Sequence, residues 1–247
     1  MEYRTKLSLL IVIFIPLCII LSIKRRESFD GGMYKHPPGS DSQQRKRERV
    51  DNILKRHAST TLGTEETPIY LINNFLSPEE CSRIIESMQG KLEKSPLTRQ
   101  DPNDPLFRTS ETGYFTNSPF HLSLEKKLCN LLEIPETYTE SSQVQHYKRR
   151  NEFKLHYDWF DHIHDKNYWM NGQRTWTAMI YLNDVEDGGH TKFPKVGADL
   201  KPIKGQLVVW SNLDQSGRPD YNTLHQGSPV KDGEKWIVTK WFLDKKG

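Results

Sequence analysis

The sequence predicts a mainly β domain with supporting α-helices, a double-stranded β-helix (jelly roll), preceded by a single N-terminal transmembrane helix. Two helical patterns come first, around 78–88 and 122–132, and short strand-like segments then follow to the C-terminus. Helices followed by many short strands are typical of a jelly roll with helices against its larger sheet. The region 68–247, about 180 residues, is about one domain in length.

The N-terminal 23 residues predict a membrane segment after a short tail, 1–6. Residues 7–23 have no charge and are rich in Leu and Ile, with basic residues before them and at 24–26. This length is at the short end for a span of about 20 apolar residues. No small-residue cleavage site follows, so an uncleaved signal anchor is favoured over a cleaved signal peptide. Either interpretation sends the chain into the secretory pathway.

Residues 24–67 are charged, contain Gly, Pro and Ser, and predict a flexible stalk. A helix over 45–56 would be transient, because only Val50, Ile53 and Leu54 could form its apolar face. The whole chain has 35 Lys and Arg against 32 Asp and Glu, and part of the basic excess lies in this segment. Nucleic-acid binding is therefore not predicted.

The domain itself is expected to begin with a strand at 68–72 and a helix at Ser77. Ser77 at the N-cap, Pro78 at the first helical position and Glu80 three residues after the cap form a capping-box pattern. A second helix at 122–132 has Leu at helical spacing. Both helices are expected to pack on a sheet.

The triplet His156-Tyr157-Asp158 and the later His225 predict a metal site. On a strand, side chains at i and i+2 point to the same face, so His156 and Asp158 can reach one ion. Segments 144–147 and 153–158 are interpreted as two strands joined by a hairpin, with His225 on a further strand. Two His and one carboxylate leave coordination positions open, as in non-haem Fe(II) oxygenases. A lone H-x-D pattern is weak evidence, and its surroundings strengthen it.

The last strand pattern, 234–243, places Lys235 on an inward face. A buried ammonium without an anion is costly, so Lys235 is expected to have an anionic partner.

These motifs occur in an order that resembles the prolyl 4-hydroxylase α-subunit-like catalytic domain of the 2-oxoglutarate/Fe(II) dioxygenases. The resemblance covers most of the last 180 residues and rests on these segments: Arg108-Thr109-Ser110, Gln143-Val144, Tyr147, His156-x-Asp158, 181–185, 188–194, Lys204-Gly205, 221–225, Lys235-Trp236 and Lys240-Trp241.

The resemblance implies a role for each site residue. The iron ligands would be His156, Asp158 and His225, and Lys235 would pair with the distal carboxylate of 2-oxoglutarate. Three further residues match positions that hold or enclose the same co-substrate: Tyr147, Thr191 and Trp241. The implied cofactors and co-substrates are Fe(II), 2-oxoglutarate and O₂, with ascorbate as reductant. The implied reaction hydroxylates prolyl residues at C4 in a proline-containing peptide or protein, as in procollagen-proline 4-dioxygenases, with succinate and CO₂ as co-products.

The sequence identifies the residues that would contact the substrate less clearly than it identifies the iron ligands. Arg108 and Glu140 are candidates to contact an extended peptide, and the competing interpretation is that both only stabilise loops. The chain departs from the family where a turn Gly and a Pro are common, because it has Arg150 and Leu155 there. The polar stretch 161–165 allows a second metal site, although a solvated loop is the favoured interpretation.

Three functions remain open. The favoured one is a membrane-anchored peptidyl-prolyl 4-hydroxylase. The others are a dioxygenase of the same fold acting on another side chain or a small molecule, and a non-catalytic jelly-roll binding module.

The larger basic group, after the membrane segment, by itself favours a cytosolic domain. The resemblance instead implies a single-pass type II protein of the endoplasmic reticulum membrane with a luminal catalytic domain. Oligomeric state is not encoded in any recognisable pattern.

Of the 3 cysteines, Cys18 lies in the membrane segment. Cys81 and Cys129 each lie on an apolar helical face, where a buried free thiol is expected. A disulfide between these two is the alternative.

Overall fold

The computed structural model describes residues 41–96, 106–161 and 165–245, and their strands form antiparallel sheets. In spatial order the large sheet contains β1 (Thr60–Gly63), β2 (Pro68–Ile72), β11 (Leu207–Ser211), β7 (Arg174–Tyr181), β14 (Lys235–Leu243), β5 (Gln143–Tyr147), β4 (Glu111–Tyr114) and β3 (Glu93–Lys94). A four-stranded sheet contains β10 (Ala198–Leu200), β9 (Thr191–Phe193), β12 (His225–Gly227) and β6 (Phe153–His156). A short pair joins β13 (Val230–Asp232) to β8 (Asp187–Gly188). The predicted mainly β jelly roll is confirmed.

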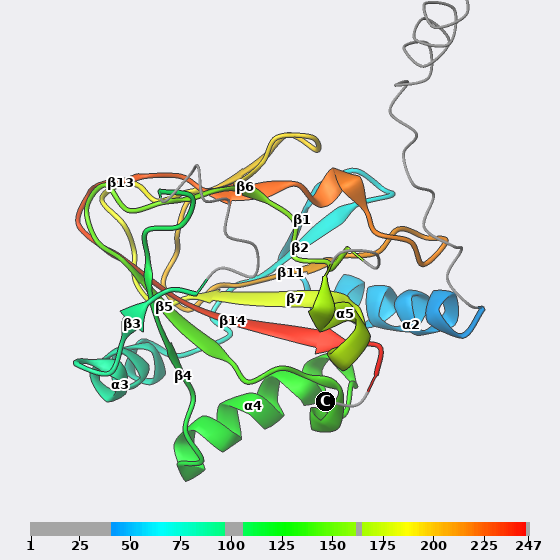
Figure 1. Cartoon of the computed structure of the whole chain (residues 1–247), viewed down its shortest axis with the longest axis horizontal. Coiled ribbons are helices and arrows are strands. Elements are labelled where there is room, and N and C mark those ends of the chain that lie inside the picture. Colours follow the sequence, from blue (N-terminus) through cyan, green and yellow to red (C-terminus); the bar gives the residue numbers. More distant parts are fainter. Residues whose placement is uncertain (1–40, 97–105, 162–164, 246–247) are drawn as a thin grey trace, which may run out of the picture. The chain divides into compact units, whose positions relative to one another are not determined.

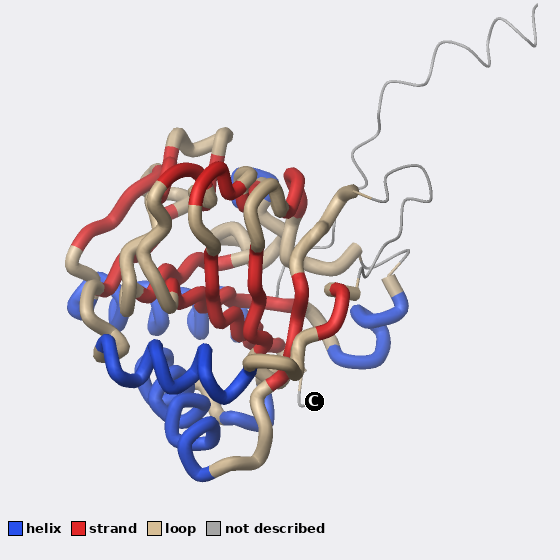
Figure 2. The backbone as a smooth tube through the Cα atoms, turned by 90° about the vertical axis from the view of Figure 1, so that its left-hand side faces the viewer, coloured by secondary structure: helices blue, strands red, loops and turns tan. Residues whose placement is uncertain are grey.

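The longer helices cover one face of the large sheet. They are α2 (Asp41–His57), α3 (Pro78–Met88) and α4 (Pro119–Leu132), and shorter helical segments are α5 (Lys166–Asn171), η1 (Glu136–Tyr138) and η2 (Tyr221–Thr223). Figure 1 places the three long helices on one side of this sheet and β6 on the other, and Figure 2 shows the same backbone turned by 90°, with helices in blue and strands in red. The domain therefore has two apolar layers, one between the helices and the large sheet and one between the sheets.

The side chains of strand β14 point alternately into one and the other of these two apolar layers. Trp236, Val238 and Phe242 pack in the layer beneath the helices, whereas Ile237 packs in the layer between the sheets. Successive side chains of a strand point to opposite faces, so Lys235 shares the face of Ile237. All nine residues of β14 are buried because both faces of this central strand are covered. The predicted inward position of Lys235 is confirmed.

The predicted start of helix α3 is also confirmed. The Ser77 hydroxyl accepts a hydrogen bond from the Glu80 backbone N–H at 3.1 Å. The Ser77 N–H in turn donates to the Glu80 carboxylate at 2.8 Å. Both halves of the capping box are present, so this helix end is specified locally.

The stalk predicted for 24–67 is wrong over residues 41–63, which belong to the folded domain. Val50 and Leu54 of α2 lie in the helix-side core, and strand β1 pairs with β2 along its whole length. The Tyr70 hydroxyl donates to the Asp51 carboxylate at 2.9 Å, which fixes α2 against β2. The apolar face of α2 is narrow, but tertiary packing stabilises a helix that would be marginal in isolation. Residues 24–40 of the predicted stalk lie outside the described residues.

The hairpin predicted around residues 148–152 is a corner between two sheets. Strand β5 pairs with β4 and β14, whereas β6 pairs with β12 in the other sheet. Two strand patterns joined by a short turn look alike in sequence whether the strands pair or separate. The separation matters, because β6 carries His156 to the strand that carries His225.

Cys81 and Cys129 are buried free thiols, as expected, and the alternative of a disulfide between them is wrong. Burial raises the pKa of each thiol to about 11. Both are therefore protonated and unreactive at neutral pH.

The predicted membrane segment, 7–23, lies outside the described residues. Among the helices that the structure describes, none combines the length and the apolar character needed to cross a bilayer.

Candidate metal centre

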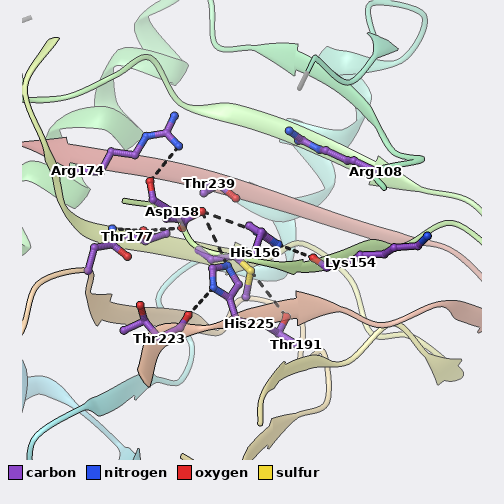
Figure 3. Close-up of polar contacts among 12 residues, drawn as sticks. Arg108, Lys154, His156, Asp158, Arg174, Thr177, Thr191, Thr223, His225 and Thr239 are labelled. Carbon is purple, nitrogen blue, oxygen red and sulfur yellow. Dashed lines mark hydrogen bonds and ion pairs between the residues drawn. The ribbon is translucent and has the colours of Figure 1, made fainter. Parts of the chain in front are cut away.

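Three potential metal ligands meet between the two sheets. The register of β6 and β12 places His156 directly opposite His225. Asp158 follows His156 by two residues, and its Oδ1 lies 3.8 Å from His156 Nε2 and 3.9 Å from His225 Nε2. One ligand atom from each residue lies within 4.8 Å of the other two (Figure 3). The three residues proposed from the sequence are thus brought together.

Hydrogen bonds hold both imidazoles in the form that can bind a metal. His156 Nδ1 lies 2.7 Å from the Lys154 carbonyl oxygen, and His225 Nδ1 lies 2.9 Å from that of Thr223. A carbonyl only accepts hydrogen bonds, so each Nδ1 carries a proton, and in the neutral ring Nε2 is the nitrogen that presents a lone pair. These backbone contacts orient the rings before any ion arrives.

The protonation states also suit a divalent cation. Burial lowers the pKa of His156 to about 3, so its ring stays neutral. Burial alone would raise the pKa of Asp158, but its interactions with His225, His156 and the Arg174 guanidinium lower it below its usual value. A neutral His156 ring beside the Asp158 carboxylate matches the ligand states that metal binding requires. The donor set fits Fe(II) in a two-His, one-carboxylate site.

Lys235 lies in the same cavity and has no carboxylate partner among the described residues. Its side chain is 2% exposed, and Nζ donates to the Thr191 hydroxyl at 3.3 Å. The ammonium also lies 5.5 Å from the Tyr147 ring centre and 5.4 Å from that of Tyr181. Burial lowers the pKa of Lys235 to about 7. An ammonium in this position is a receptor for a small anion.

The other predicted co-substrate residues line this cavity as well. Tyr147, Thr191 and Trp241 border it together with the metal ligands and Lys235. The Tyr147 hydroxyl donates to Gln145 Oε1 at 2.9 Å. The metal ligands and Lys235 therefore line one and the same cavity.

An outer groove opens onto the metal ligands and contains both predicted substrate residues. Arg108 is 6% exposed, and its guanidinium donates to the Ser110 and Thr112 hydroxyls at 3.1 Å each. Glu140 accepts two hydrogen bonds from Arg174, at 2.5 and 2.7 Å. Both predicted residues line the groove, and both are engaged in contacts within the protein.

Arg174 is a groove residue that the sequence analysis missed. Its guanidinium lies 3.8 Å from the centre of a Trp241 ring, and Nη1 donates to the Asp158 carbonyl at 3.4 Å. Its position at the start of an apolar strand was the only sequence pattern that could have indicated it. The residues that Arg174 contacts are distant in sequence, so the pattern did not identify them. The solvated loop favoured at 161–165, and its alternative of a second metal site, fall mostly on residues outside the described part. Asp165 caps α5 by accepting from the Asn167 N–H.

The two facing sheets and the His-Asp-His site define a jelly-roll oxygenase of the two-His, one-carboxylate type. Residues 142–243 match the family model described as the 2OG-Fe(II) oxygenase superfamily. Relatives in Arabidopsis thaliana include probable prolyl 4-hydroxylase 7, 34% identical over 198 residues, and probable prolyl 4-hydroxylase 6, 33% identical over 197 residues. Each alignment covers 70% of this chain, and 62% and 68% of the respective relative. The chain belongs to the prolyl 4-hydroxylase family within this superfamily.

Solved structures agree with this assignment. The viral collagen prolyl hydroxylase of Paramecium bursaria Chlorella virus-1, in its 2-oxoglutarate complex, is 30% identical with a TM-score of 0.55. The alignment covers 70% of this chain and 94% of the viral one. A prolyl-4-hydroxylase of Pseudomonas putida, 18% identical with a TM-score of 0.52 over 81% of this chain and 99% of that chain, shares the fold.

Proposed function

We propose that this protein hydroxylates prolyl residues of proteins at C4, using Fe(II), 2-oxoglutarate and O₂. The observation that carries the proposal is the pairing, in one cavity, of the His-Asp-His triad with a buried ammonium that has no carboxylate partner in the described parts of the chain. The triad by itself could hold several metals. Lys235 adds a buried positive charge in the same cavity, which suits an anionic co-substrate such as a keto dicarboxylate.

The chain's own residues would position the reactants. His156, Asp158 and His225 would hold the ion, and Lys235 with the Thr191 hydroxyl would bind the distal carboxylate. When bound, Fe(II) and 2-oxoglutarate would supply the oxidative chemistry: O₂ is reduced, 2-oxoglutarate is decarboxylated to succinate and CO₂, and a substrate C–H bond is hydroxylated. Ascorbate would serve as the reductant that keeps the iron ferrous.

The outer groove is the candidate site for a proline-containing peptide. It opens onto His156 and Asp158 and is bordered by Arg174 and Trp241. The support for a prolyl substrate comes from the relatives, among them a viral collagen prolyl hydroxylase at 30% identity.

The test is succinate release by the purified full chain with Fe(II), 2-oxoglutarate and ascorbate, with and without a proline-rich peptide. We expect the peptide to stimulate succinate release and to gain one oxygen atom at a prolyl residue, with Asp158→Ala as the inactive control. Turnover that the peptide does not affect would reject the prolyl substrate and keep the dioxygenase. Absence of turnover would favour a binding module.

We also propose that residues 7–23 anchor the protein in the endoplasmic reticulum membrane with the domain in the lumen. The support is the uncharged segment in the sequence, together with the type II topology that the family resemblance implies. Protease digestion of intact microsomes containing the full chain tests the orientation. A protected domain is expected, and a digested one would reject the luminal placement.

A further inference from the structure

The two carboxylate oxygens of Asp158 have different environments. Oδ1 faces the Nε2 atoms of His156 and His225, at 3.8 and 3.9 Å. Oδ2 points away from them and accepts a hydrogen bond from the Thr177 hydroxyl at 2.8 Å (Figure 3). Asp158 is 6% exposed and Thr177 is fully buried, so water does not compete for this contact. One oxygen is therefore held by the protein and the other is left for the ion.

The direction of the Thr177 hydroxyl is set by a further residue, Asn212. Asn212 Nδ2 donates to Thr177 Oγ1 at 2.9 Å. A hydroxyl has one proton to donate, and with an amide donor on its lone pair the proton is left for Asp158 Oδ2. Thr177 lies on β7, and Asn212 directly follows β11, which is the neighbouring strand in the large sheet.

The surroundings of Asn212 argue that this contact is more than packing. Its backbone N–H donates to the Thr175 carbonyl at 2.8 Å, and its carbonyl accepts from the Asp220 N–H at 2.9 Å, which fixes the residue in place. Asn212 is fully buried, and its Oδ1 has no partner among the described residues. A buried unpaired acceptor destabilises the fold, so an apolar side chain would suit a purely structural role better.

We propose that Asn212 and Thr177 form a relay that fixes the rotation of the Asp158 carboxylate, and thereby positions the third ligand of the metal site. Both are positioning residues, since neither contacts the ion or the co-substrate directly. The relay ends on the ligand that supplies the negative charge. Free rotation of this carboxylate would allow it to turn Oδ1 away from the two imidazoles. The inference rests on the proposed metal site and is independent of the proposed prolyl substrate.

Co(II) titration of the metal-free full chain tests the relay without turnover, because the visible absorption of the bound ion reports its coordination geometry. Thr177→Val keeps the side-chain shape and removes the hydroxyl. We expect its affinity for Co(II) to fall ~10- to 100-fold, in the range for loss of a partner of a ligand, with an altered spectrum. Thr177→Ser retains the hydroxyl and should restore both affinity and spectrum. Asn212→Leu should weaken binding by a smaller factor, because the Thr177 hydroxyl remains but its direction is no longer set.

Thr175→Val is the matched control. Thr175 lies on the same strand, and its hydroxyl donates to the Phe242 carbonyl at 3.1 Å, away from the metal ligands. Circular dichroism of each metal-free variant checks that the fold is retained, and Asn212→Leu decides the question if Thr177→Val does not fold.

Four results would overturn the relay. The first is wild-type Co(II) affinity in both Thr177→Val and Asn212→Leu, and the second is a loss of Co(II) affinity in Thr175→Val as large as that in Thr177→Val. The third is failure of Thr177→Ser to restore Co(II) binding, and the fourth is absence of Co(II) binding by the wild-type chain. The last result would also remove the proposed metal site, whereas the first three would leave that site intact.

Discussion

At the scale of single residues, burial sets the pKa of the Lys235 ammonium and therefore the pH range in which it is charged. Its pKa falls from 10.5 to about 7, and burial is the cause. Above pH 7 the ammonium of the empty site therefore loses its proton, while below pH 7 it is charged. An anion that needs the charged form must then bind together with a proton.

We therefore predict that 2-oxoglutarate binding weakens as the pH rises from 7 to 9. The limiting change is about tenfold in the dissociation constant per pH unit, since one proton is taken up per anion bound. Isothermal titration of the Co(II)-loaded chain, in two buffers of different ionisation enthalpy, measures both the constant and the proton uptake. A dissociation constant that is the same at pH 7 and pH 9 would show that Lys235 stays protonated.

Replacing the charge tests the same residue in a second way. Lys235→Met keeps the length of the side chain and leaves a bound distal carboxylate without its partner. We predict a loss of about 2–4 kcal/mol in 2-oxoglutarate binding, within the range for one member of a buried charge pair. Co(II) affinity should stay within a few-fold of wild type. Collapse of metal binding in this variant would mean that Lys235 is structural.

At the scale of elements, the turn that connects β5 to β6 retains a backbone conformation that suits Gly. Arg150 occupies the position where the family resemblance implies a Gly, and its φ is 70°. Its N–H donates to the Val230 carbonyl at 2.7 Å, and the Asn151 N–H closes the turn on the Lys148 carbonyl at 2.8 Å. The departure noted in the sequence therefore leaves the turn in place and puts an Arg in the left-handed region.

We predict that Arg150→Gly stabilises the protein. The left-handed conformation costs a non-Gly residue ~1–2 kcal/mol, and Gly loses ~0.5–1 kcal/mol through its greater freedom when unfolded. The free energy of unfolding, measured with urea, should rise by roughly 0.5–1 kcal/mol.

Arg149→Gly is the matched control in the same turn. Arg149 is not among the described residues with positive φ, and its Nε donates to the Lys231 carbonyl at 2.8 Å. This variant should lose stability. A gain of stability in both variants would show that the backbone conformation of Arg150 is not the cause.

At the scale of the whole molecule, helix α2 extends the domain well before the first strand predicted from sequence. Val50 and Leu54 lie in the same core cluster as residues of α3, α4 and the large sheet. The Arg47 guanidinium donates to the Glu66 carbonyl at 2.9 Å, which adds a polar attachment. A fragment that begins at Pro68 would lack this cover of the sheet.

We predict that Leu54→Ala lowers the free energy of unfolding by about 2–5 kcal/mol, the usual cost of truncating a fully buried Leu. Leu54 is 0% exposed and lies on the helix side of the sheet, away from the metal ligands. Urea unfolding measures the loss, and Co(II) affinity should not change. The neighbouring exposed Lys55→Ala should change stability by less than about 0.5 kcal/mol. An equally small effect of Leu54→Ala would mean that α2 does not contribute to the core.

Much of the site could be predicted because its signals are local. His156 and Asp158 share one face of a strand at i and i+2, and Lys235 alternates inward on an apolar strand; both patterns follow from strand geometry alone. The capping box of α3 is equally local, since Ser77 and Glu80 interact across one helical turn. In each case the partners are close in sequence, so backbone geometry already determines how they lie.

The sequence by itself determined the fold class and the start of α3, and, with the resemblance, the family and the residues of the metal site. Only the tertiary structure decided that β5 and β6 enter different sheets, that α2 packs on the core, and that Asn212 reaches Asp158 through Thr177. These contacts join residues far apart in the chain. The local sequence does not specify the partner of a short apolar stripe, of a turn or of a buried Asn. Long-range packing supplies that partner, and the free energy of the contact comes from it.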